Sequence, residues 1–69
     1  MPLPDDPAEL QRLLADLKLE HKDLDASITR LETLPLIDEL MLRRLKKRKL
    51  QIKDRIAAIE RLLGPDLIA

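Results

Sequence analysis

The segment LETLPLIDELML, residues 31–42, decides the fold because one heptad pattern ends inside it and a second begins. Proline disfavours helical geometry in the residue before it and has no N–H to donate, so Pro35 ends a helix close to Leu34. Asp38 can cap a new helix on the other side. The segment therefore predicts a turn at residues 35–37 between two helices.

On the N-terminal side of this turn, apolar residues recur in alternating steps of four and three. Asp6 can cap this helix, and Pro7 suits its first position. The pattern predicts a helix over about residues 7–34 with a heptad seam, in which His21 is the only polar member. The seam consists of Leu10, Leu14, Leu17, His21, Leu24, Ile28 and Leu31.

A second heptad seam follows the turn, with Lys49 as its only polar member. It predicts a helix over about residues 38–63, which Gly64 and Pro65 end before a short tail at residues 64–69. The short connection favours antiparallel neighbours, so we expect an all-α, coiled-coil-like helical hairpin that is a single domain, residues 1–69. The second seam consists of Leu42, Leu45, Lys49, Ile52, Ile56, Ile59 and Leu63.

The two seams can be aligned by centring the turn near residues 36 and 37. Leu31 then faces Leu42, and both polar seam residues lie near the middle of the hairpin. Several apolar residues remain outside the seam, and a second hairpin that covers them would give a four-helix dimer or a higher oligomer. If the chain forms this homo-oligomer, we expect that changing both Leu13 and Leu50 to Glu gives a monomer. The off-seam residues are Leu13, Leu19, Leu34, Leu40, Met41, Leu50 and Leu62.

The composition excludes several kinds of chemistry. The 69 residues contain no cysteine, one histidine, one glycine and no aromatic residue. Disulfides, thiol nucleophiles and thiolate metal sites are therefore excluded, and no glycine loop for phosphate is present. Ser27 lies six residues from His21, so no nucleophile and base are paired on one helix face. We expect no enzymatic activity, no catalytic or metal site and no cofactor.

The chain shows no targeting signal for a membrane or for secretion. Residues 1–6 lack a basic region followed by an apolar run, as a secretory signal requires. No apolar run reaches the roughly 20 residues of a membrane span. We therefore expect a cytoplasmic protein without a membrane partner.

Charge is divided unevenly between the two halves of the chain. Residues 1–35 contain four basic and eight acidic residues, a net charge of −4, and residues 36–69 contain nine basic and five acidic residues, a net charge of +4. The densest cluster is RRLKKRK, residues 43–49. It could bind a polyanion, or acids of the first helix could neutralise it. In the aligned hairpin, Glu20, Asp23 and Asp25 lie beside Lys46, Lys47 and Arg48.

The two polar seam residues each have two interpretations. His21 could be a pH-sensitive or ligand-binding residue, or a half-buried histidine that fixes register, with Asp25 within reach four residues on. Lys49 could lay its methylenes over apolar neighbours and extend its ammonium outward, or it could pair with an acid of the first helix or another protomer.

Asp54 has no basic residue three or four positions away along its own helix. It could pair across the hairpin with Lys18, Lys22 or His21, or it could help to dock a partner. Lys53 beside it extends the basic region beyond residues 43–49.

Two stretches carry a family resemblance: LEHKDLDASITRL at residues 19–31 and LKKRKLQIKDRI at residues 45–56. Together they resemble the YdcH-like family of small bacterial proteins, a domain of unknown function. The basic run that closes on Lys53 and Asp54 is the more specific part. The resemblance implies a short cytoplasmic helical hairpin without an established enzymatic activity, and it implies no substrate, cofactor or partner.

The sequence thus favours an interaction or structural module that acts through helix packing and self-association. We expect a homo-oligomer, and in addition a protein partner that the sequence does not identify. The candidate interaction or register residues are His21, Asp25, Lys46, Lys49, Leu50, Lys53 and Asp54. The alternative is weak, sequence-independent nucleic-acid binding through residues 43–53, although no aromatic residue is present for base stacking. Peripheral membrane attachment is weaker still, because the basic helix has no aromatic anchor.

Overall fold

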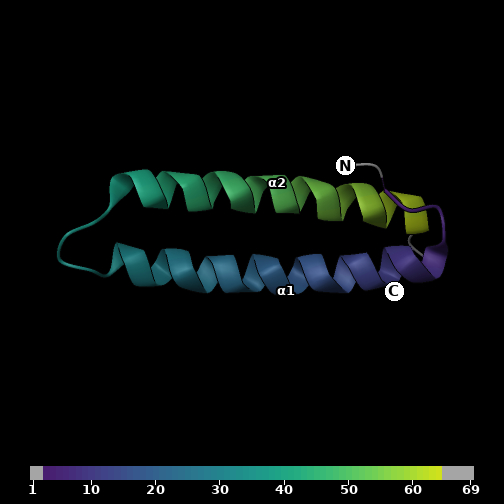
Figure 1. Ribbon diagram of the computed structural model, residues 1–69, viewed down its shortest axis with the longest axis horizontal. Coiled ribbons are helices and arrows are strands. Elements are labelled where there is room, and N and C mark those ends of the chain that lie inside the picture. The colour runs from purple at the N-terminus through teal and green to yellow at the C-terminus, as the bar shows by residue number, and fades with distance from the viewer. Residues whose placement is uncertain (1–2, 65–69) are drawn as a thin grey trace.

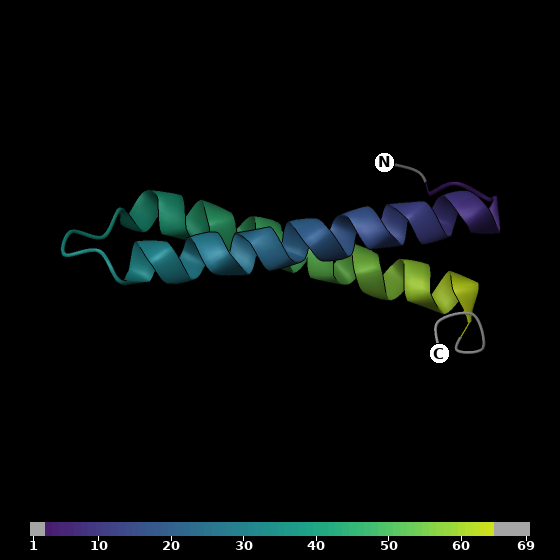
Figure 2. The same ribbon diagram turned by 90° about the horizontal axis from the view of Figure 1, so that it is seen from below.

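The computed structural model describes residues 3–64 and contains two antiparallel helices (Figure 1). Helix α1 spans Pro7–Glu32 and helix α2 spans Glu39–Leu63. At about 1.5 Å per residue, each helix is about 40 Å long. Seen after a 90° turn, the helices cross near their middle (Figure 2). The predicted all-α hairpin is confirmed.

Helix α1 begins as its sequence predicts. Asp6 is the N-cap in extended backbone geometry, and its side chain accepts a hydrogen bond of 3.0 Å from the N–H of Ala8. Pro7 occupies the first turn, where backbone N–H groups have no acceptor within the helix, so the missing N–H of proline costs no helical hydrogen bond. The carbonyl of Asp6 accepts the first helical bond, from the N–H of Leu10 at 2.9 Å.

Helix α1 ends at Glu32, two residues before the predicted end at residue 34. Leu34 precedes a proline, which disfavours helical geometry there, so the helix must close earlier. Thr33 closes it: the N–H of Thr33 and its hydroxyl both donate to the carbonyl of Arg30, the latter at 2.8 Å. The connection between the helices therefore covers residues 33–38 rather than 35–37.

Helix α2 begins one residue after the predicted start because Asp38 is its cap and not its first helical residue. The Asp38 side chain accepts a hydrogen bond of 3.0 Å from the N–H of Met41. At the other end, Gly64 has φ of +79°, a geometry open mainly to glycine, and its N–H donates to the carbonyl of Glu60 at 3.0 Å. The remainder of the predicted tail, residues 65–69, lies outside the described residues.

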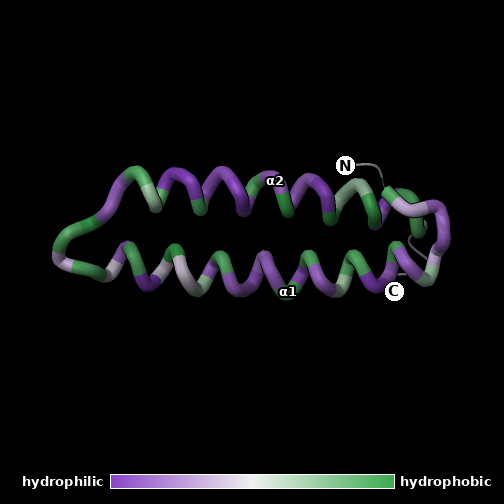
Figure 3. The backbone as a smooth tube through the Cα atoms, viewed as in Figure 1, coloured by the Kyte–Doolittle hydropathy of each residue, from purple (hydrophilic) through white to green (hydrophobic). Residues whose placement is uncertain are grey.

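Most of the buried core lies in the half of the hairpin that is distant from the turn, and Ile28 is a buried residue nearer the turn. Hydrophobic residues recur on the facing sides of the helices along their length (Figure 3). Burial is uneven, however: Ile52 and Ile59 are fully covered, whereas Leu31, Leu42 and Leu45 near the turn are only half-buried. The core cluster consists of Leu10, Leu14, Leu17, Ile52, Ile59 and Leu63, all of them predicted seam residues.

Candidate interaction surface

Large apolar side chains remain exposed around the turn and along α2. Around the turn, Leu36 is 89% exposed, and Leu34 and Ile37 are also exposed. The sequence predicts only a connection at Leu36 and Ile37, although the run LPLI is itself a signal of apolar surface. The exposed set is Leu19, Leu34, Leu36, Ile37, Leu40, Met41, Leu50 and Leu62. Leu13 is different, because it is half-buried and packs against the core.

A groove of about 370 Å³ lies between the helices beside the turn. Its wall is mainly apolar, with Ser27 and Arg30 as the polar residues. The half-buried seam residues of this end contribute to it, so it continues the apolar surface of the turn. It is lined by Ser27, Arg30, Leu31, Leu34, Met41 and Leu45.

The structure brings together three predicted residues near the middle of the hairpin. Lys49 forms an ion pair with Asp25, and His21 Nδ1 lies 3.5 Å from the other Asp25 carboxylate oxygen. The hydrogen bond from Lys49 lowers the pKa of Asp25, and electrostatic interactions with Lys49 and His21 add to this effect against the opposing effect of desolvation. Because all three side chains remain partly exposed, this is a surface cluster and not a buried ion pair.

The basic cluster is neutralised only in part. Arg48 donates two hydrogen bonds to Glu20 from its Nε and Nη2 atoms, and Lys46 lies 3.7 Å from Glu32. A further ion pair across the hairpin joins Lys18 and Glu60 at 3.7 Å.

Other charged residues of this region form no ion pair within the described part of the chain, 3–64. They are Asp23, Arg43, Arg44, Lys47 and Lys53. Neutralisation by acids of α1 therefore applies to Lys46, Arg48 and Lys49. Within the described residues, the other four cations of this region have no ion-pair partner.

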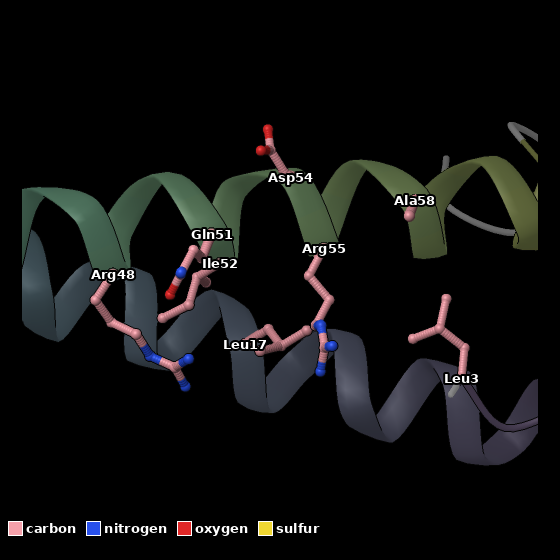
Figure 4. Close-up of a pocket in the computed structure, with 8 residues that line it drawn as sticks. All are labelled: Leu3, Leu17, Arg48, Gln51, Ile52, Asp54, Arg55 and Ala58. Atoms are coloured by element: carbon pink, nitrogen blue, oxygen red, sulfur yellow. The ribbon is translucent and has the colours of Figure 1, made fainter. Parts of the chain in front are cut away.

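Asp54 does not form the predicted pair with Lys18, Lys22 or His21. In the close-up of the 640 Å³ groove along one side of the hairpin, its carboxylate points away from α1 (Figure 4). The Arg48 and Arg55 side chains extend in the opposite direction, toward α1 (Figure 4). Asp54 lies two positions from the buried Ile52, so it is about 200° around the helix from the core.

Residues 14–60, more than half of the chain, match the family described as a protein of unknown function, DUF465. The chain belongs to the DUF465 family. The match covers both stretches that carried the YdcH-like resemblance, and it confirms that prediction. A comparison with curated proteins and one with solved structures each gave no match. Membership of the DUF465 family assigns no function to the chain. The proposed function therefore rests on the residues exposed at the surface of the hairpin.

Two further kinds of feature are absent from this DUF465 hairpin as far as residues 3–64 show. Neither of its helices combines the length and the apolar character that crossing a membrane requires. Nor do three histidine, cysteine, aspartate or glutamate side chains gather where a metal ion could bind within that range.

Proposed function

We propose that the protein is a non-enzymatic cytoplasmic module that acts through helix packing and associates with a second copy of itself. The observation that supports the proposal is the balance of apolar surface. Among residues 3–64, seven apolar side chains are buried, whereas eight large ones are exposed. Exposed apolar surface on a short chain without cysteine is what a second helical layer would cover.

We place the contact with the second copy on helix α2. Four of the exposed apolar residues belong to α2, whereas Leu19 is the single one within α1, the rest lying in the connection. The charged residues without a partner on α2 give the packing an orientation, because opposite charges across a helix interface favour one alignment over others.

The test is the oligomeric state of two matched variants. Leu50→Glu places a charge on α2, and Leu19→Glu places one on α1, where the leucine is equally exposed at 61%. We expect sedimentation velocity to show self-association of the wild type and of Leu19→Glu, and its loss in Leu50→Glu. Leu13 is unsuitable for this test, because its contact with the core means that a charge there would unfold the hairpin itself. A wild type that stays monomeric at every concentration would refute self-association.

A second candidate, nucleic-acid binding, rests on the four uncovered cations Arg43, Arg44, Lys47 and Lys53. Phosphate contacts by such side chains weaken steeply with salt. We would measure fluorescence anisotropy of labelled duplex DNA and labelled single-stranded RNA at about 50 and 200 mM salt. Saturable, salt-sensitive binding that is lost in Lys47→Glu/Lys53→Glu would favour this function. Absence of binding at the lower salt would leave protein partners.

A further inference from the structure

One face of α2 carries both exposed leucines and charges of opposite sign. Residues spaced by three, four and seven positions share a face of a helix, and this face lies opposite the buried Ile52 and Ile59. Every member is exposed. We call it the α2 outer stripe: Leu40, Arg43, Lys47, Leu50, Asp54 and Arg61.

The α2 outer stripe has a symmetric arrangement of charge. Lys47 and Asp54 lie seven residues apart, which is two helical turns or about 10 Å, with Leu50 between them. Asp54 projects from α2 away from α1 (Figure 4). Within residues 3–64, neither Lys47 nor Asp54 has an ion-pair partner. Two such stripes that run in opposite directions place each lysine opposite the aspartate of the other.

We propose that the α2 outer stripe binds the same stripe of a second copy in antiparallel orientation, with Lys47 of each chain paired with Asp54 of the other. The proposal rests on the proposed self-association and specifies its surface and register. The two-fold axis passes between residues 50 and 51, so Leu50 meets Leu50 of the second copy. Such an interface is isologous, because the same patch serves on both chains.

The remaining positions of the stripe fit the same register. Arg61 falls beside Leu40 and the acidic Glu39 of the second copy, and Arg43 falls beside Ala58. The lysine and arginine stems can cover the apolar and small residues that they meet, while their charged ends stay in water. Because much of the face is polar, we expect a weak dimer that dissociates on dilution and in high salt.

Charge disfavours the neighbouring alternatives. A shift by one heptad in one direction opposes Lys47 to Lys47, and a shift in the other direction opposes Asp54 to Asp54. A parallel pair in register opposes both like-charged pairs at once. Like charges held at contact distance cost free energy, so the antiparallel register with exchanged pairs is selected by repulsion as well as by attraction.

The test is a charge exchange measured by sedimentation equilibrium over a concentration series. Lys47→Asp and Asp54→Lys each create like-charge contacts in the homodimer, and we expect each to weaken it on the order of tenfold or more. Mixing the two variants opposes only opposite charges, so the mixture should form a heterodimer as tight as the wild-type dimer. The control is Lys22→Asp on α1, at an exposed lysine without a partner in the described residues; it should dimerise like the wild type. Far-ultraviolet circular dichroism checks that each variant remains helical.

The outcomes separate the two proposals. If both single variants dimerise as tightly as the wild type, the proposed register is wrong, although self-association is retained. The same conclusion follows if the wild type dimerises but the mixture of the two variants does not. A wild type without any dimer would overturn both.

Discussion

Asp25 is one of the residues through which charge joins the two helices. It contacts Lys49 on α2 and His21 on its own helix, yet its side chain is 46% exposed. Water screens such a pair, so its contribution to stability is small. Its effect on the folded protein is still measurable, because the hydrogen bond from Lys49 holds the pKa of Asp25 below the usual range.

The lowered pKa predicts a dependence of stability on pH. Because the folded-state pKa of Asp25 lies below the unfolded one, its stabilisation is complete above the unfolded value of about 4. It is lost as pH falls through the folded-state pKa. We therefore expect Asp25→Asn to be less stable than the wild type at neutral pH and equal to it in strong acid, as measured by urea unfolding across that range. Asp16→Asn, at an exposed acid without an ion pair within residues 3–64, is the control. A difference that persists unchanged into strong acid would contradict the assignment.

The contrast between Asp25 and Asp54 shows what sequence could predict at this scale. The aligned seams place Asp25 beside Lys46, Lys47 and Arg48, and in the structure Asp25 pairs with the next residue, Lys49. Asp54 was expected to pair as well, but it lies on the far side of α2 (Figure 4). Its position relative to Ile52 already indicated this. Whether a given cation in residues 43–49 forms an ion pair depends on the rotamer of its long side chain. The periodicity of the sequence does not specify that rotamer.

At the scale of the elements, the helix ends were predictable because each depends on local chemistry. Asp6, Pro7 and Asp38 act at the positions that their residue types favour. The predicted end of α1 lies two residues too late because the prediction rests on Pro35 alone. Steric restriction by proline directly reaches only the residue before it, and the earlier end depends on the Thr33 hydroxyl, which competes for the carbonyl of Arg30.

The cap of α2 leads to a prediction about stability. Asp38→Ala removes the hydrogen bond to the Met41 N–H and the negative charge at the helix start. We expect a loss of about 1 kcal/mol in the free energy of unfolding, measured by urea denaturation. Asp5→Ala is the matched control, because Asp5 is exposed and forms no hydrogen bond within the described part of the chain. An equal loss in both variants would mean that the cap does not stabilise α2.

At the scale of the whole molecule, the seam predicted which residues are buried but not how deeply. Leu42 and Leu45 belong to the seam as fully as Ile52 and Ile59 do, yet only the latter pair is fully covered. The heptad repeat fixes the face of a helix and not the distance between helices, which varies along the hairpin with the side chains between them. The end near the turn is therefore the part of the seam with the least burial.

The uneven core predicts that stability is concentrated in a few residues distant from the turn. Ile59→Ala removes buried methyl and methylene groups and leaves a cavity, which typically costs about 2–5 kcal/mol. A core this small rarely supplies more than about 3–5 kcal/mol in total, so the variant should lose most of its helical signal in circular dichroism at 25 °C. Leu50→Ala removes an exposed side chain and should remain folded, with any change confined to self-association. If Ile59→Ala were as helical as Leu50→Ala, the stability of the hairpin would have to come from contacts between chains, because the intramolecular core would then be dispensable.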